Sequence, residues 1–185
     1  MGEIKDYIWS LPAIGGFISI IAILCPAAYF DYGPPEYFIL YKHLELWMWN
    51  LTHISQNWWL GVSFGYYGDT VEISLNFSGF SLIFGLVFSC IIIIVSSLTI
   101  FYASQVRKRK IEPSKAIKLW FLFAIIMITS LIGWMLTQEF FIQQTSTYND
   151  VPFSFWTYFT PGFGVIGPFI AAALILINIL LAKIL

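Results

Sequence analysis

The stretch Phe80–Lys110, FSLIFGLVFSCIIIIVSSLTIFYASQVRKRK, is largely apolar, carries no charge until its end and then closes with four consecutive cations. A helix of about 20 apolar residues is long enough to cross the hydrocarbon core of a bilayer. Lys and Arg near the end of a span are retained on the cytoplasmic side of the membrane. The stretch therefore predicts a membrane-spanning helix over Phe80–Tyr102 followed by a cytoplasmic basic loop at 103–118.

Three further uncharged stretches are long enough to span: Leu11–Phe30, Leu119–Thr137 and Val165–Leu181. The composition agrees, because 59% of the residues are hydrophobic, 10% are charged and the mean hydropathy is +0.81, whereas soluble domains are about 25% charged. Lys5 precedes the first stretch and Lys183 ends the last. We therefore expect one tetraspan domain over 1–185, an all-α four-helix bundle in the cell membrane with both termini cytoplasmic.

The same orientation places the segments 31–79 and 138–164 outside the cell. Seven of the ten acidic residues fall in these two segments. They are Asp31, Glu36, Glu45, Asp69, Glu72, Glu139 and Asp150.

The first outer segment carries the pattern of a small antiparallel β-sheet. From Val71 to Phe77 apolar and polar residues alternate, which is the period of a half-buried strand. Trp58–Tyr66 has one bulky and one mostly small parity, and the turn residues Tyr67-Gly-Asp69 separate it from the next strand. Because an isolated hairpin is marginal in water, His43–Ser55 is expected to add a third element, as a strand or a short helix.

Aromatic residues dominate both outer segments, and Trp and Tyr contribute most to the energetics of protein interfaces. We predict that these side chains form a small core and the partner-binding surface. The alternative is an interfacial belt of tryptophans at one depth of the membrane. The candidate residues are Trp47, Trp49, Trp58, Trp59, Tyr66, Tyr67, Phe155 and Trp156.

Two acceptor motifs for N-glycosylation, at Asn50 and Asn76, lie in the segment that the charges place outside. The two cysteines, Cys25 and Cys90, fall in predicted spans, so the outer segments have no disulfide framework. We interpret both cysteines as small buried hydrophobic residues; pairing across two helices is the alternative.

Few residues could carry chemistry. His43, Glu45 and His53 are the one plausible set of metal ligands. In a helix the two histidines would lie on different faces, and in a strand they would stand about 33 Å apart. No metal site or cofactor is therefore expected, and the chain has no recognisable motif for phosphate binding, nucleophilic catalysis or haem attachment.

The predicted spans contain few polar groups, which argues against a pump or coupled carrier. Asn178 is the most polar residue in them, and we expect it to hydrogen-bond between helices. The glycines of Gly162–Gly167 either allow close helix approach or leave the chain flexible before the last span. Topology alone accounts for the basic residues Arg107, Lys108, Arg109 and Lys110; binding to anionic lipid headgroups is the alternative.

The order of spans and loops, with a Trp-bearing sheet in the first outer loop (LWMWNL, 46–51, and NWWLG, 57–61), resembles the claudin and peripheral-myelin-type tetraspan superfamily. The cysteine pair of that family's first loop is absent here. The resemblance implies a claudin-like α+β fold and a non-enzymatic protein whose outer sheet contacts other proteins.

Taken together, these patterns favour a membrane protein that acts in protein assembly or adhesion through its aromatic outer domain. The expected partners are membrane lipids and either further copies of the chain or other membrane protein subunits, with no nucleic acid. An accessory subunit of a larger membrane enzyme or transporter is the alternative, and a passive pore is a third.

Overall fold

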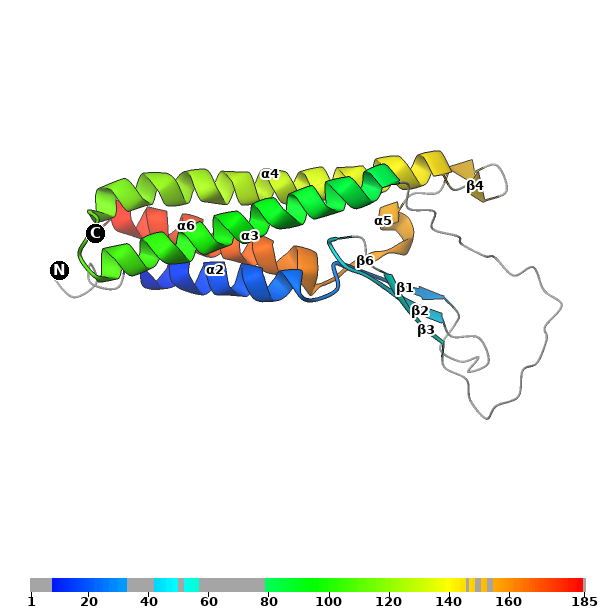
Figure 1. Ribbon diagram of the computed structural model, residues 1–185, viewed down its shortest axis with the longest axis horizontal. Helices are drawn as coiled ribbons and strands as arrows, with labels where there is room; N and C mark the ends of the chain where they lie inside the picture. Colours follow the sequence, from blue (N-terminus) through cyan, green and yellow to red (C-terminus); the bar gives the residue numbers. More distant parts are fainter. Residues whose placement is uncertain are drawn as a thin grey trace.

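The computed structural model describes residues 8–32, 42–49, 52–56, 79–145, 147–148, 151–152 and 155–184. Within these residues the chain is mostly helical and adds a small antiparallel sheet (Figure 1). The elements are α2 (Ser10–Ile23), β1 (Ala28–Tyr32), β2 (Lys42–Leu46), β3 (Thr52–Gln56), α3 (Gly79–Arg107), α4 (Pro113–Thr145), β4 (Thr147–Tyr148), β5 (Val151–Pro152), α5 (Phe155–Tyr158), β6 (Thr160–Pro161) and α6 (Phe163–Ile184).

Three of the helices, α3, α4 and α6, are long and apolar enough to cross a membrane. They confirm three of the four long helices that the sequence predicts. Helix α3 reaches Arg107 and α4 reaches Thr145, so the expected loops at 103–118 and 138–164 are partly helical. Between α3 and α4 the connection shortens to residues 108–112.

The first predicted span, Leu11–Phe30, is not a single helix in the structure. Instead of one helix over Leu11–Phe30, α2 ends at Ile23 and the chain continues into strand β1. Pro26 explains the break, because proline has no backbone N–H to donate and disfavours helical backbone in the preceding residue. The last turn of α2 closes with a hydrogen bond from the Cys25 N–H to the Ala22 carbonyl.

The sheet has the strand order β3-β2-β1-β6, and all its neighbours are antiparallel. The segment His43–Ser55, expected as a single strand or helix, contributes two strands joined by a short connection. In contrast, the predicted strands Trp58–Tyr66 and Val71–Phe77 lie outside the described residues. A second sheet consists only of β4 and β5.

The four larger helices lie side by side, with α2 in contact with α3 and α6, and α4 in contact with the same two helices. Figure 1 shows the start of α2, the end of α6 and the α3–α4 turn at one end, and the sheet at the other. We call these the turn end and the sheet end.

Small residues allow this close packing. A Cβ on Gly15 of α2 would lie 2.9 Å from the backbone oxygen of Ala171 on α6, and a Cβ on Gly167 would overlap the Cβ of Ala22. Such short approaches are typical of helix contacts in membrane proteins. Between the two possibilities for the glycines before the last span, the structure thus favours close helix approach.

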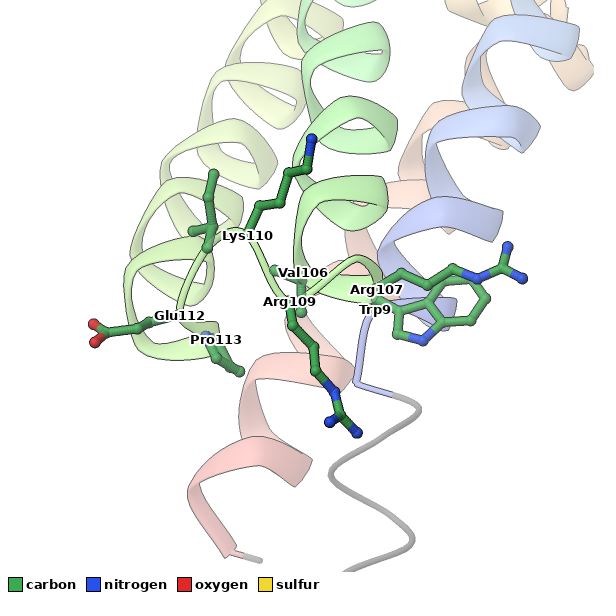
Figure 2. Close-up of a pocket in the computed structure, with 8 residues that line it drawn as sticks. Trp9, Val106, Arg107, Arg109, Lys110, Glu112 and Pro113 are labelled. Carbon is green, nitrogen blue, oxygen red and sulfur yellow. The ribbon is translucent and has the colours of Figure 1, made fainter.

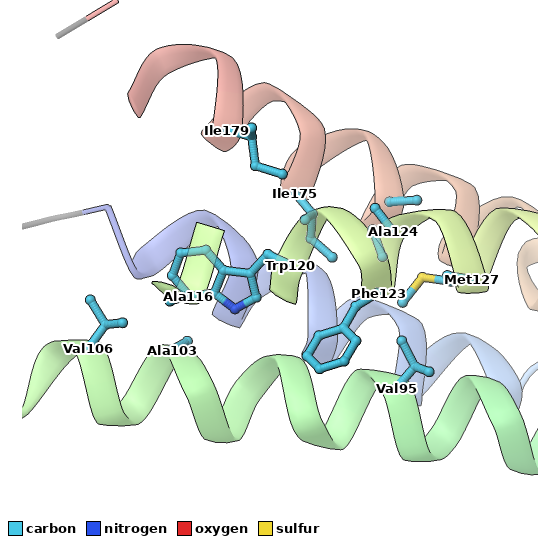
Figure 3. Packing of buried hydrophobic residues seen from close by; sticks show 12 residues of the cluster. Val95, Ala103, Val106, Ala116, Trp120, Phe123, Ala124, Met127, Ile175 and Ile179 are labelled. Atoms are coloured by element: carbon cyan, nitrogen blue, oxygen red, sulfur yellow. The ribbon is translucent and has the colours of Figure 1, made fainter. Parts of the chain in front are cut away.

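Two clusters of buried apolar residues fill the interior. The turn-end cluster joins α3, α4 and α6 and includes Trp120, Phe123 and Ile175 (Figure 3). The sheet-end cluster joins the helices to the sheet through Ile92, Leu131, Trp134, Leu46 and Met48. This second cluster positions the sheet.

Candidate functional site

Two tryptophan indole groups join the segment after β2 to the helices, and a third joins α5 to α4. The Trp134 Nε1 of α4 donates to the Met48 carbonyl at 2.7 Å. The Trp156 Nε1 of α5 donates to the Met135 carbonyl at 3.1 Å, and the Trp47 Nε1 donates to the Leu24 carbonyl at 3.2 Å. Tryptophan suits this position because its large ring is apolar while its N–H needs a partner when buried.

Backbone hydrogen bonds complete this junction where the helices give way to strands. The Ala27 N–H donates to the Leu46 carbonyl, the Gly162 N–H to the Ala27 carbonyl, and the Gly164 N–H to the Pro26 carbonyl. Glycine is needed at both donors, because a Cβ at either would run into the backbone at Pro26 or Cys25. The segment after α2 therefore has backbone partners in the sheet and at the start of α6.

Aromatic rings fill the space between α4, α5 and the sheet. Phe155 is fully buried and stacks on Phe159, with ring centroids 4.1 Å apart. Trp156 lies edge to face against Phe155 and Trp134. Its backbone N–H donates to the Glu139 carboxylate at 3.3 Å. This arrangement holds the short α5 against the sheet end of α4.

Four of the predicted partner-binding residues lie at this junction: Trp47, Trp49, Phe155 and Trp156. Because Phe155 has no exposed surface and the indoles of Trp47 and Trp156 bond to the chain's own backbone, their visible role is internal. The structure does not describe Trp58, Trp59, Tyr66 or Tyr67, nor the predicted glycosylation sites Asn50 and Asn76. Trp134 is not among the predicted candidates, although its place near the outer end of a predicted span was a usable signal.

The register of the sheet brings polar residues together that the sequence analysis had separated. Glu45 of β2 pairs directly with His53 of β3 and with Tyr29 of β1. In the adjacent row His43 pairs with Ser55 and with Asp31. The estimate of about 33 Å between the two histidines assumed one continuous strand, and the chain reversal between β2 and β3 makes it wrong.

This polar face is opposite the residues that pack on the helices. Ala28 and Leu46, directly paired and both fully buried, occupy the other parity. The pKa of Tyr29 is raised above its usual value, mainly because the phenol is partly buried. The negative charge of Glu45 and then Cys25 raise it further. Within the described part of the chain, no group of three His, Cys, Asp or Glu residues is close enough to hold a metal ion.

The turn end carries the predicted basic residues. Helix α3 closes with hydrogen bonds from the Arg109 N–H to the Val106 carbonyl and from the Lys110 N–H to the Gln105 carbonyl. These bonds form a Schellman motif, whose left-handed residue is usually glycine. Here Arg109 takes that place with φ of 55°, so a cation occupies a position where glycine would be less strained.

A cleft of about 390 Å³ lies beside this turn, between the start of α2 and the end of α3 (Figure 2). The Arg107 guanidinium lies 4.8 Å from the centre of the Trp9 ring. Figure 2 shows Lys110 pointing back along α3 and Arg109 pointing in the opposite direction. Because these cations diverge, they do not form a single cradle for one anion.

Buried polar groups in the helices are few. The Ser96 hydroxyl donates to the Ser19 hydroxyl at 2.9 Å and so links α3 to α2. The amide nitrogen of Asn178 and the indole nitrogen of Trp120 are buried without a hydrogen-bond partner in the described part of the chain. The Asn178 nitrogen therefore makes no interhelical hydrogen bond, and the bond expected of Asn178 stays a prediction.

Both cysteines are free thiols. Cys25 is half-buried and Cys90 is exposed on α3. The expected burial thus fails for Cys90, which lies on a helix whose exposed side chains include Ile83, Leu86 and Val87.

Comparison with family models, with curated proteins and with solved structures finds no match to this chain. The resemblance to claudins therefore stays a prediction from the order of spans and loops.

Proposed function

We propose that this chain is a tetraspan protein of the cell membrane that presents its sheet outside the cell and binds other proteins there without catalysing a reaction. The supporting observation is the junction at which two indole hydrogen bonds and buried aromatic rings hold the sheet against the helices, while a third indole bond holds α5 against α4. A sheet held in this way loses little conformational freedom when a partner binds, which favours affinity.

The helices support placement in a membrane. Large apolar side chains are exposed along α3, α4 and α6, as in Phe101, Ile132 and Leu180. In water such surfaces would be strongly unfavourable, whereas lipid chains cover them at no cost. The four contacting helices are then the tetraspan bundle.

The first crossing needs more than α2, because 14 residues give a helix of only about 21 Å and the hydrocarbon core is about 30 Å thick. We propose that the segment from Leu24 to Ala28 completes this crossing. Non-helical backbone is tolerated at membrane depth only where its polar groups are satisfied by protein. The hydrogen bonds of Cys25, Ala27, Gly162 and Gly164 supply partners of that kind.

The charges support the orientation with the turn end in the cytoplasm. Six cations lie between residues 107 and 118, and Lys183 closes α6 at the same end. The divergent directions of Arg107, Arg109 and Lys110 suit contact with the headgroups of several anionic lipids rather than one specific site. With an even number of crossings, both termini lie in the cytoplasm and the sheet lies outside.

The partner is either a second copy of this chain or another membrane protein. Since the junction uses Trp47, Phe155 and Trp156 internally, the partner contact is assigned to the remaining candidates, Trp58, Trp59, Tyr66 and Tyr67. The mass of the complex extracted from native membranes in mild detergent tests this proposal. We expect either a homo-oligomer or a fixed ratio to a second chain, and a monomer of about 21.2 kDa in every detergent tried would contradict it.

Variants connect the complex to the proposed surface. The double variant Trp58→Ala/Trp59→Ala is expected to fold and to lose its partner. Its matched control is Trp120→Phe, which alters an equally large ring far from the sheet. A complex that survives the double variant unchanged would remove those two tryptophans from the interface.

A further inference from the structure

Helices α3 and α4 continue past the ends of α2 and α6 and run alongside α5 and the sheet (Figure 1). Helix α2 ends at Ile23, which lies in the same buried cluster as Ile92 of α3 and Leu131 of α4. Beyond that level, residues 79–92 of α3 and 131–145 of α4 each form about 20 Å of helix. We call these two parts together the helical extension.

One side of the helical extension is covered by the chain itself. The Trp134 indole donates to the Met48 carbonyl after β2, and the Trp156 indole of α5 donates to the Met135 carbonyl. Away from these contacts the extension exposes large apolar side chains, each between 45% and 64% accessible. They are Ile83, Leu86 and Val87 of α3 and Ile132 and Leu136 of α4. We call these five residues the extension face.

The extension face continues the apolar surface of the rest of α3 and α4. Between Lys118 and Glu139, α4 carries 20 uncharged residues, and their length of about 30 Å equals the thickness of a hydrocarbon core, about 30 Å. The last eight of these residues, 131–138, belong to the helical extension. If the hydrocarbon ended level with Ile23, the extension face would stand in water, which is unfavourable for a contiguous apolar patch.

We propose that acyl chains of the outer leaflet cover the extension face, while α5 and the sheet take the place of lipid on the other side of the extension at the same depth. The hydrocarbon is then thinner beside α2 and α6 than beside α3 and α4. This agrees with the short α2, and a bilayer thins at modest cost to match a short apolar segment. The inference rests on the proposed membrane placement and adds to it the depth of the sheet.

The test compares a label on the extension face with one on α5. Leu136 is 64% exposed, and Thr157 is exposed next to Trp156, whose indole bonds to the neighbouring Met135 carbonyl. A single cysteine at either position carries a nitroxide label in the full-length protein, with both native cysteines replaced by alanine, in phosphatidylcholine vesicles. Electron paramagnetic resonance measures collisions of the label with oxygen, which enters hydrocarbon, and with a polar nickel chelate, which is excluded from it.

We expect the ratio of oxygen to nickel collisions to be more than about fivefold higher at Leu136→Cys than at Thr157→Cys. A ratio at Leu136→Cys as low as at Thr157→Cys would place the extension face in water and overturn the proposal. Few collisions with either reagent at Leu136→Cys would also overturn it, because protein rather than lipid would then cover the face. A high ratio at both positions would contradict the replacement of lipid by α5 and the sheet.

Ile125→Cys is the control for membrane placement, because Ile125 is an exposed residue nearer the middle of the uncharged part of α4. Its ratio of oxygen to nickel collisions should be high whatever the depth of the sheet. A low ratio at Ile125→Cys would contradict the membrane placement itself, and the inference with it. A high ratio there together with a low one at Leu136→Cys would leave the membrane placement intact and reject this inference alone.

Discussion

At the scale of single residues, Trp134 and Trp120 show how the same side chain serves two different purposes. Both are fully buried on α4. The Trp134 indole donates to the Met48 carbonyl at 2.7 Å, whereas the Trp120 indole nitrogen has no partner in the described part of the chain. One therefore ties the sheet to a helix, and the other contributes apolar volume to the turn-end cluster.

Replacing each tryptophan by phenylalanine separates these contributions. Trp134→Phe leaves the buried Met48 carbonyl without its donor, so it should lower the free energy of unfolding by about 1–3 kcal/mol more than Trp120→Phe does. Both substitutions remove similar ring volume, which makes Trp120→Phe the control. Unfolding in detergent, followed by the remaining tryptophan fluorescence, measures the difference. Equal losses would mean that the indole bond does not hold the sheet.

At the scale of elements, the contact between α2 and α6 depends on the absence of side chains. The added Cβ of Gly15→Ala would meet the Ala171 backbone oxygen at 2.9 Å, and backbone cannot move cheaply. We expect a loss of about 1–3 kcal/mol in the free energy of unfolding. Gly133→Ala is the control, since its nearest atoms belong to the ring of Phe88, a side chain that can shift. A variant of Gly15 as stable as the Gly133 variant would refute the close-packing account.

The sequence predicts the elements that depend on local patterns and misses those that depend on contacts between distant segments of the chain. Three long helices follow from apolar length, a local property, and the structure confirms them. Pro26 was a local signal for the end of α2, which the length of 20 uncharged residues outweighed. Strand β1 itself was missed because it forms only where β2 lies beside it. The pairing of Glu45 with His53 was missed for the same reason: no local pattern shows that the chain reverses between Leu46 and Thr52.

The candidate site, too, could be predicted only in part from the sequence. An aromatic core near the outer segments follows from composition, and Trp47, Trp49, Phe155 and Trp156 do gather at the junction. Which indole meets which carbonyl does not follow, because Trp134 and Met48 are 86 residues apart in the chain. Hydrogen bonds of this kind are fixed by packing between elements rather than by spacing along the sequence.

At the scale of the whole molecule, the central claim is that the chain crosses the membrane four times although only three of the described helices are long enough alone. We propose that the short α2 and the segment after it together make the first crossing. If α2 does not cross, the N-terminus and the sheet lie on the same side of the membrane. The sidedness of these two parts therefore decides the claim.

Labelling of single cysteines with a membrane-impermeant maleimide measures that sidedness most directly. The background is Cys25→Ala/Cys90→Ala, and the probes are Glu3→Cys before α2, Gln56→Cys at the end of β3 and Lys110→Cys in the α3–α4 turn. On intact cells the account predicts labelling of Gln56→Cys alone, with Glu3→Cys and Lys110→Cys reacting only after permeabilisation. Labelling of Glu3→Cys and Gln56→Cys from the same side would contradict four crossings.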